Sequence, residues 1–288
     1  MDHRALKQFV NLAQSLHFGR ASEASNVSPS ALSRSIQRLE DELGVTLFER
    51  NNRSVSLTHA GTLFLAWARD SLGDWDAIRN TLLAESGELR GEVSIYCSVT
   101  ASYSFLFEIL ARVRRHHPRI EIKLHTGDPE DAIHRVLAGS EDIAIAARPG
   151  KLQAGLAFSQ IDVSPLVFIA SRDHPVPPRP KAAHWLDCPM ILSERGLARE
   201  RVDRWFRKTG VQPNIYAQVA GNEAIVSMVS LGFGVGVVPQ IVLENSPLSG
   251  TVRTLEVEPE LAPYEVGLVT QEKKLSSPLI SAFWQALE

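Results

Sequence analysis

One segment of this 288-residue chain, residues 28–43, constrains the fold more than any other because it predicts a helix with two different faces. Apolar residues recur at steps of four, three and four and predict one buried stripe, at Leu32, Ile36, Leu39 and Leu43. The opposite face carries hydroxyl, amide and guanidinium groups, at Ser30, Ser33, Arg34, Gln37 and Arg38. Such side chains hydrogen-bond base edges and phosphate oxygens in a DNA major groove, although an ordinary solvated face can have the same composition.

The residues before this segment predict the remainder of a helix-turn-helix. Apolar residues at steps of three and four indicate a first helix, with a stripe at Leu6, Phe9, Val10, Ala13 and Leu16. A short helix with Ala21 and Ala24 on its small face should follow, and a turn over residues 25–27 ends it. Ser28 is expected to cap the next helix, and Pro29 fits its first position, where a missing N–H costs nothing. A groove-reading helix begins in this way.

The residues after Gly44 predict a small β-hairpin. Two short alternating runs flank Asn51 and Asn52, a pair typical of a turn. Arg50 and Arg53 should lie near its tip, where a wing can contact the phosphate backbone. The net charge of the chain is only −3, so local arginines, and not the overall balance, indicate DNA binding.

A long amphipathic helix is predicted to start after Thr58, which can act as its N-cap. Its apolar side carries the residues expected at a self-association surface, at Phe64, Trp67, Ser71, Trp75, Ile78 and Leu82. On an isolated helix this apolar stripe would be exposed to solvent, so the same helix of a second copy is the expected partner. The alternative is that the stripe packs only on its own helix-turn-helix. Residues 86–91 then break the periodicity and predict a hinge.

Alternating strands and helices in the remainder predict an α/β domain with a largely parallel sheet. The first part is expected to contain strands at 93–99, 120–124 and 143–147 and helices at 105–116 and 129–137. A second part should contain strands at 166–170 and 215–219 and helices at 199–208 and 223–231. The chain should then return to the first part through a strand at 266–270 and a helix at 278–287. Two lobes joined by crossing strands would leave a cleft between them.

These patterns predict four regions. The expected boundaries are 1–58 for a winged helix-turn-helix, 59–86 for the linker helix, 87–91 for the hinge and 92–288 for a two-lobe domain. Within that domain, lobe I is expected at 92–163 and 265–288, and lobe II at 164–264. The length and the 44% apolar content allow two or three such compact units.

Candidate ligand contacts follow from the expected sheet, because ligands bind beyond the carboxyl ends of parallel strands, beside helix N-termini. The residues expected there are Ser98, Thr100, Ser102, Thr126, Asp128, Arg148, Gly196, Gly221 and Asn222. Hydroxyls and free backbone N–H groups suit a small carboxylate, whose charge Arg148 would complement. Taken singly, each serine or threonine could be no more than a helix cap.

An enzyme is the main alternative function class. A glycine-rich run at 232–236 and the acidic residues Asp128, Glu130 and Asp131 could suggest nucleotide or metal chemistry. The glycines follow a helix and lack the spacing of a dinucleotide site, so close packing at a crossing between the lobes explains them better. The acidic residues open a helix, where the dipole favours negative charge. No set of catalytic side chains emerges, and therefore no catalysis, cofactor or metal is expected.

A plain solute-binding protein is the second alternative, which the helix-turn-helix and the lack of an export signal oppose. No apolar run approaches about 20 residues, so a cytoplasmic protein with no membrane partner is expected. Cys97 and Cys188 have no close cysteine or histidine neighbours in the sequence. They are expected to be buried free thiols and not a disulfide or a metal site.

Several segments together resemble the N-terminal module of LysR-type transcriptional regulators, at residues 18–24, 27–40, 43–44, 47–50 and 57–61. The resemblance implies a mainly α winged helix-turn-helix, a linker helix that pairs two copies, and a periplasmic-binding-protein-like effector domain that the stretch 139–145 also matches. Arg20 and Ser28 lie in the matched segments and join the candidate DNA contacts. Much of the family has Gln-Pro where this chain has Pro29 and Ser30, which moves the base-contact role towards Ser30, Ser33 and Arg34.

The resemblance also implies partners and a mechanism. The partners are promoter DNA, a small inducer, further copies of the chain in a homodimer or homotetramer, and RNA polymerase. Inducer binding between the lobes should favour one lobe closure over another and so alter the placement of the paired DNA modules. The expected result is altered DNA bending and better access for RNA polymerase.

Other segments are similar to a narrower group of the family, the activators of the acetohydroxy acid isomeroreductase gene in branched-chain amino acid synthesis. They lie at 97–104, 121–124, 126–128, 157–159, 205–207, 223–224, 226–229 and 242–247. This resemblance implies 2-acetolactate or 2-acetohydroxybutyrate as the inducer, each with a carboxylate, a tertiary hydroxyl and a ketone. A LysR-type regulator of a different small-acid pathway is the alternative, because the same polar cleft would fit other hydroxy or keto acids.

Overall fold

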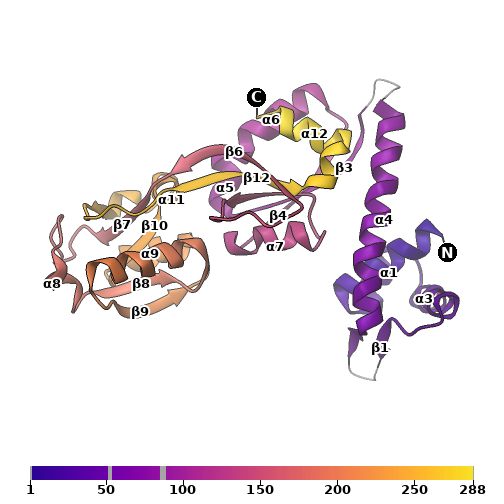
Figure 1. The fold of residues 1–288 in the computed structure, drawn as a ribbon, viewed down its shortest axis with the longest axis horizontal. Helices are drawn as coiled ribbons and strands as arrows, with labels where there is room; N and C mark the ends of the chain where they lie inside the picture. The colour runs from indigo at the N-terminus through magenta and orange to yellow at the C-terminus, as the bar shows by residue number, and fades with distance from the viewer. Residues whose placement is uncertain (1, 51–53, 85–88, 288) are drawn as a thin grey trace. The chain divides into compact units, whose positions relative to one another are not determined.

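The computed structural model describes residues 2–50, 54–84 and 89–287, and its contacts divide the chain into two units, 1–87 and 88–288. The first unit has helices and a hairpin in the order α1 His3–Ser15, α2 Phe18–Ala24, α3 Pro29–Leu43, β1 Phe48–Arg50, β2 Val55–Leu57 and α4 His59–Ala84 (Figure 1). Arg53 and the first two residues of the expected hinge, 87 and 88, lie outside the described residues. No helix that the structure describes has both the length and the apolar content to cross a membrane.

Polar caps determine where the three short helices of the first unit begin. Asp2 accepts a hydrogen bond from the Ala5 N–H at 2.6 Å and opens α1, and His17 caps α2. Ser28 Oγ accepts from the Ala31 N–H at 3.2 Å, and Pro29 is the first residue of α3. The predicted start of the groove-reading helix is therefore confirmed.

The apolar stripe of α3 is buried as predicted at Leu32, Ile36 and Leu39. The prediction is wrong for Leu43, which is exposed because it is the last residue before the left-handed Gly44 cap, where the helix ends. Leu16 is exposed for a similar reason, since it forms the left-handed C-cap of α1 and leaves the stripe.

The α2 helix is buried through Ala21 and Ser22, whereas Ala24, expected on the packed face, is exposed. Ala24 is the final residue of this seven-residue helix, where the buried face has already ended. The long helix α4 starts as expected, because Thr58 Oγ1 accepts from the Gly61 N–H at 2.9 Å.

Lobe I of the second unit contains a five-stranded sheet in the order β4-β3-β5-β12-β6 (Figure 1). Its strands are β3 Gly91–Cys97, β4 Ile120–Thr126, β5 Ile143–Ala147, β6 Leu156–Ser164 and β12 Tyr264–Gln271. Helices α6 and α12 bury one face of the sheet and α7 the other. The helical elements are α5 Val99–Ser104, α6 Leu106–His116, η1 Pro129–Asp131, α7 Ala132–Leu137, η3 Glu272–Ser276 and α12 Pro278–Gln285.

Lobe II contains a second five-stranded sheet, in the order β11-β7-β10-β8-β9. Its strands are β7 Leu166–Ser171, β8 Pro189–Ser193, β9 Asn214–Val219, β10 Val235–Pro239 and β11 Val252–Leu255. Helices α8 and α9 bury one face and α10 and α11 the other. The helical elements are α8 Ala182–Trp185, α9 Gly196–Thr209, α10 Asn222–Ser230, α11 Gln240–Glu244 and η2 Ser249–Thr251.

The prediction of a largely parallel sheet is wrong, because both sheets are mixed. Strand β12 runs antiparallel to β5 and β6, and β7 runs antiparallel to β10 and β11. The cause is the connection between the lobes: the chain leaves lobe I along β6 and returns along β12, and these neighbours point in opposite directions. Strands β6, β8, β10 and β11 were not among the predicted elements, whereas each predicted strand and helix of the second unit is present.

Two of the glycines at 232–236, Gly234 and Gly236, allow close packing inside lobe II and not at a crossing between lobes. A side chain at Gly234 would overlap the Pro189 carbonyl, and one at Gly236 would press against Ile225 and Val229 of α10 at 2.5 and 2.9 Å. The packing interpretation is confirmed for Gly234 and Gly236 but not for Gly232, where an added Cβ would meet nothing within 4 Å and a φ of +82° favours glycine instead. The predicted location is corrected, because β10 lies in the middle of the lobe II sheet.

Both cysteines are free and buried, as predicted. Burial raises the pKa of the Cys97 thiol to about 12 and that of the Cys188 thiol to about 11.

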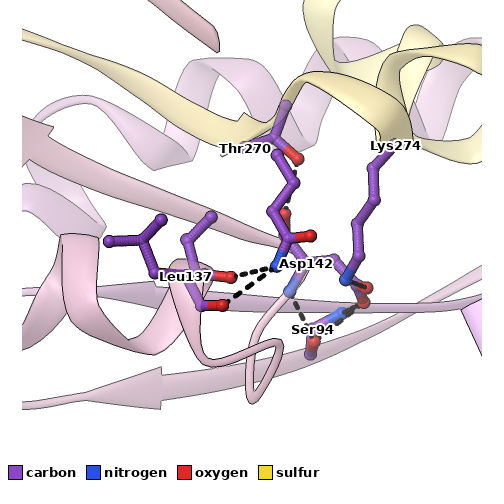
Figure 2. Close-up of polar contacts among 7 residues, drawn as sticks. Ser94, Leu137, Asp142, Thr270 and Lys274 are labelled. Carbon is purple, nitrogen blue, oxygen red and sulfur yellow. Dashed lines mark hydrogen bonds and ion pairs between the residues drawn. The ribbon is translucent and has the colours of Figure 1, made fainter. Parts of the chain in front are cut away.

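Asp142 joins three segments of lobe I (Figure 2). Its Oδ2 accepts from the N–H and hydroxyl of Ser94 at 2.9 and 2.8 Å, and its Oδ1 lies 2.7 Å from Lys274 Nζ. The Thr270 hydroxyl donates to the Asp142 carbonyl at 2.7 Å. Burial alone would raise the pKa of Asp142, but Lys274 and the Ser94 hydrogen bonds outweigh it and lower the pKa.

We expect Asp142→Asn to lower the free energy of unfolding of the second unit at pH 7 by about 2 kcal/mol, because charge-assisted hydrogen bonds are lost. The lowered pKa of Asp142 stabilises the fold above the pKa of the unfolded carboxyl, about 3.9, and this contribution is lost as the pH falls through the folded value. Urea unfolding at pH 7 and pH 3 measures both effects. Asp173→Asn, at an exposed position, is the control, and an equal loss in both variants would contradict the assignment.

Candidate functional site

The outer face of α3 is available for a partner. Ser30, Arg34, Gln37 and Arg38 are exposed, and Ser33 is half-buried beside them. Ser30 Oγ lies 3.1 Å from the capping Ser28 Oγ, and Arg34 Nε donates to the Ser30 carbonyl at 3.4 Å. Gln37 Nε2 donates to Asp41 at 3.0 Å. The predicted face is therefore a continuous polar surface in which the guanidinium groups remain accessible.

The two other candidate contacts of this unit differ in their surroundings. Arg20 is exposed on α2, the helix that precedes the turn into α3. Arg50 already has partners within the unit. Its Nη2 lies 2.6 Å from Glu40 Oε2, and its guanidinium lies 5.4 Å from the Phe18 ring centroid. The wing arginine thus has a structural role inside the unit as well as any role towards DNA.

Glu40 is the residue that sequence reasoning missed in this unit. It is only 7% exposed, and its Oε1 accepts from the N–H groups of Leu47 and Phe48 at 2.8 and 3.1 Å. With the Arg50 ion pair, this carboxylate fixes the hairpin to the end of α3. The sequence placed Glu40 in an acidic run at the helix end, where a solvated charge was the natural interpretation.

The predicted self-association stripe of α4 divides into two parts. Phe64 packs inside its own unit, with ring centroids 4.9 Å from Phe9. Ser71 is half-buried. The other four side chains are exposed by 46 to 61%, at Trp67, Trp75, Ile78 and Leu82. Four large apolar side chains on one helix form an unusually apolar exposed surface.

The second unit holds a cavity of about 250 Å³ between its two lobes. Lobe I contributes the start of α5, the turn η1 and the end of β5, and lobe II contributes the starts of α9 and α10. The polar side chains in the wall belong to Ser98, Thr100, Glu130, Glu200, Asn222 and Tyr264. The apolar wall includes Phe105, Ile133, Ile145, Leu197, Ile241 and Val266. None of the described residues that line it is lysine, arginine or histidine.

Four of the nine predicted ligand contacts line this cavity, namely Ser98, Thr100, Gly196 and Asn222. Asp128 and Gly221 line a smaller adjoining pocket instead. Ser102 and Thr126 line neither of these two pockets; the Ser102 hydroxyl donates to the Val99 carbonyl at 2.6 Å and Thr126 is exposed at the end of an edge strand.

Arg148 does not line the cavity, although its neighbours Pro149 and Gly150 do. Its Nη1 lies 3.1 Å from Glu265 Oε2, and its guanidinium lies 5.4 Å from the Phe158 ring centroid. The expectation that Arg148 supplies positive charge to the site is therefore not met in this structure, because a carboxylate on the neighbouring strand β12 holds the side chain elsewhere.

Two carboxylates, one from each lobe, accept hydrogen bonds from the opposite lobe. Glu223, in the first turn of α10 in lobe II, accepts from the Thr100 N–H and hydroxyl of lobe I at 3.2 and 2.6 Å. Glu130 of lobe I reaches the start of α9 in lobe II, where its Oε2 accepts from the Leu197 N–H at 3.4 Å. Each lobe thus places a carboxylate at the first turn of a helix of the other lobe, where backbone N–H groups favour negative charge.

An ion-pair cluster borders the Glu130 contact. Arg195 of lobe II lies 3.2 Å from Asp128 Oδ2 and 2.8 Å from Asp131 Oδ1 of lobe I. Asp128 also caps η1, so the interpretation of an acidic helix start holds for it. For Glu130 and Asp131 the more important contacts are with the opposite lobe, which a local sequence pattern does not reveal.

The pKa values of Glu130 and Tyr264 in this site differ from the ordinary values of these groups. Burial raises the pKa of Glu130 to about 7; the Leu197 N–H partly offsets this and the negative charge of Asp128 adds to it. Burial, with Glu130 nearby, also raises the pKa of the Tyr264 hydroxyl, which stays neutral. The described cavity can therefore offer neutral donors, backbone N–H groups and a carboxyl that changes charge near neutral pH.

Comparison with known proteins accounts for both units. Residues 3–62 match the family model "Bacterial regulatory helix-turn-helix protein, lysR family", and residues 86–288 match "LysR substrate binding domain". The chain is 46% identical over 294 residues to the HTH-type transcriptional activator IlvY of Salmonella typhimurium, covering 100% of this chain and 99% of that protein. It is 40% identical to IlvY of Haemophilus influenzae over 100% of both chains.

Solved structures show the same fold. A full-length OxyR variant from Pseudomonas aeruginosa superposes with a TM-score of 0.73 at 24% identity, covering 100% of this chain and 94% of that one. Full-length CbnR in complex with its target DNA superposes with a TM-score of 0.65 at 23% identity, covering 100% and 99%. IlvY is a transcriptional activator and CbnR is a LysR family transcriptional regulator. With both family models matched and a full-length relative at 46% identity, the chain belongs to the LysR family of bacterial transcriptional regulators.

Proposed function

We propose that this protein is a transcriptional activator that binds promoter DNA and responds to 2-acetolactate or 2-acetohydroxybutyrate, and so controls branched-chain amino acid synthesis. The observation that carries the proposal is the 46% identity to the activator IlvY along the whole chain. The family matches show that the chain is a LysR-type regulator. The inducer and the pathway are inferred from the likeness.

The proposed DNA contacts are the α3 face and the wing. Arg34 and Arg38 are exposed guanidinium groups on the same side as Ser30 and Gln37, a set that suits base edges and phosphates. Arg20 and Ser28 would contact the backbone beside them, and Arg50 would approach phosphate from the hairpin. The relative CbnR has been solved on its target DNA, which supports this use of the fold.

The proposed assembly is a homodimer or homotetramer that pairs through α4. Trp67, Trp75, Ile78 and Leu82 leave a long apolar surface exposed, and the same surface of a second copy is complementary to it by symmetry. Two paired DNA modules would then read two operator half-sites. RNA polymerase is the proposed further partner, recruited when inducer binding changes the placement of the two modules.

The proposed inducer matches the cavity in size and chemistry. A volume of about 250 Å³ lies below the roughly 300–1,000 Å³ of drug-sized ligand pockets, which favours a small metabolite. The hydroxyls of Ser98 and Thr100 and the amide of Asn222 can bind the tertiary hydroxyl and ketone of an acetohydroxy acid. The N–H groups that open α10 can bind its carboxylate, since Glu130 already accepts from the Leu197 N–H at the start of α9.

A thermal-shift comparison tests the inducer. We expect 2-acetolactate and 2-acetohydroxybutyrate to raise the melting temperature, because a ligand that binds only the folded state stabilises it by mass action. Pyruvate and 2-oxobutyrate lack the tertiary hydroxyl and should leave it unchanged. A shift with other hydroxy or keto acids alone would instead assign the protein to a different small-acid pathway.

Substitution of Arg34 tests the DNA surface. We expect Arg34→Ala to weaken binding to its promoter fragment by about 5- to 150-fold, since a well-placed base contact contributes about 1–3 kcal/mol. Fluorescence anisotropy measures the affinity and circular dichroism verifies the fold. Arg114→Ala, at an exposed position on α6 of the second unit, is the control. Unchanged promoter affinity in Arg34→Ala would remove this residue from the DNA surface.

Substitution of Thr100 tests the cavity. We expect Thr100→Val to keep promoter affinity but weaken inducer binding about tenfold, because one hydrogen bond to a polar or charged ligand is lost. Inducer titration of the promoter complex measures the change. Thr254→Val, on β11 and outside the cavity wall, is the matched control. A variant that responds at the wild-type inducer concentration would place the ligand elsewhere.

A further inference from the structure

The Glu130 carboxyl occupies the position in the cavity that is most favourable for an anion. It lies against Gly196, the first residue of the 14-residue helix α9, and accepts from the Leu197 N–H at 3.4 Å. Gly196 has φ +90°, and any side chain there would overlap the Glu130 carboxyl. The sequence thus provides both a carboxyl in lobe I and the space for it in lobe II.

The groups around Glu130 make its negative charge costly when a second anion enters. From its own turn, the negative charge of Asp128 acts on it; Arg195, which lowers the pKa of Glu130, already pairs with both Asp128 and Asp131. From α9, Glu200 lies in the same cavity wall, and from β12 the neutral Tyr264 hydroxyl does. The described lining has no cationic side chain that could offset two neighbouring carboxylates.

Protonation removes this conflict. Burial raises the pKa of Glu130 to about 7, so a proton is available to it near neutral pH at little cost. An acidic ligand beside it would raise that pKa further, since a like charge disfavours the ionised form. The neutral carboxyl can then donate a hydrogen bond to the ligand instead of repelling it.

We propose that Glu130 is a specificity-determining residue that couples effector binding to protonation, so that an acidic effector enters the cavity together with one proton taken up by this carboxyl. The inference rests on the proposed function, because it requires that the effector is a carboxylate. The effector affinity then falls as the pH rises above neutrality. Glu130 thereby disfavours doubly charged acids, which would need more than one proton.

Isothermal titration calorimetry with freshly prepared 2-acetolactate tests the coupling. At pH 8 the binding heat of the wild-type protein should differ between phosphate and Tris buffers by an amount that corresponds to uptake of nearly one proton. Between pH 6 and pH 8 the affinity should fall about tenfold, as expected for a carboxyl with a pKa of about 7 that is protonated in the complex. In Glu130→Gln the buffer dependence should vanish and the affinity should change less than twofold over this range.

A matched control separates Glu130 from the other cavity carboxyl. Glu200→Gln removes a carboxylate from the same wall and should retain the proton uptake. Binding by the wild type without proton uptake would overturn this inference alone and leave the proposed function intact. Loss of binding in Glu130→Gln at every pH would also overturn it, because it would mean that the ionised carboxylate is needed. No binding by the wild type at pH 6 would contradict the acidic effector itself and both proposals with it.

Discussion

The arrangement of the second unit depends on carboxylates that cross the cleft. Two connections join the lobes, one from β6 into β7 and one from β11 into β12, so polar contacts across the cleft set how the lobes meet. Glu130 and Glu223 make those contacts in opposite directions, each with backbone N–H groups of the other lobe. Glu130 lies in the cavity wall and Glu223 holds Thr100, another wall residue, so the proposed effector would bind beside both contacts. Ligand affinity and lobe position are therefore linked through neighbouring contacts.

The first unit uses a buried carboxylate in a different way. Glu40 accepts two backbone N–H groups at the start of the hairpin and pairs with Arg50, so the recognition helix and the wing are held as one body. A conformational signal to this unit can therefore change how the whole module is placed, but it has little freedom to change the angle between α3 and the wing. This rigidity is consistent with a mechanism in which transcription is controlled by the position of two paired DNA-binding units and not by a change of shape within each unit.

Much of this fold could be predicted from local signals. The start of α3 follows from Ser28 and Pro29, and the start of α4 from Thr58, because capping is a contact within three residues. The alternation of strands and helices predicted the lobes but not the mixed sheets, since strand direction depends on where the chain re-enters lobe I. Ser98 and Thr100 were recognised as cavity residues because they follow a strand directly. The contacts of Arg148 and Glu130 could not be predicted, because their partners, Glu265 and Leu197, are 117 and 67 residues away.

The buried thiols have a consequence for what the regulator can sense. Oxidants attack the thiolate, and the burial that raises the pKa of Cys97 keeps this thiol protonated at pH 7. Cys188 is similarly protected, and the chain has no third cysteine. Peroxide therefore finds no reactive sulfur at which to start a disulfide relay. Neither thiol is therefore suited to make the regulator respond to peroxide.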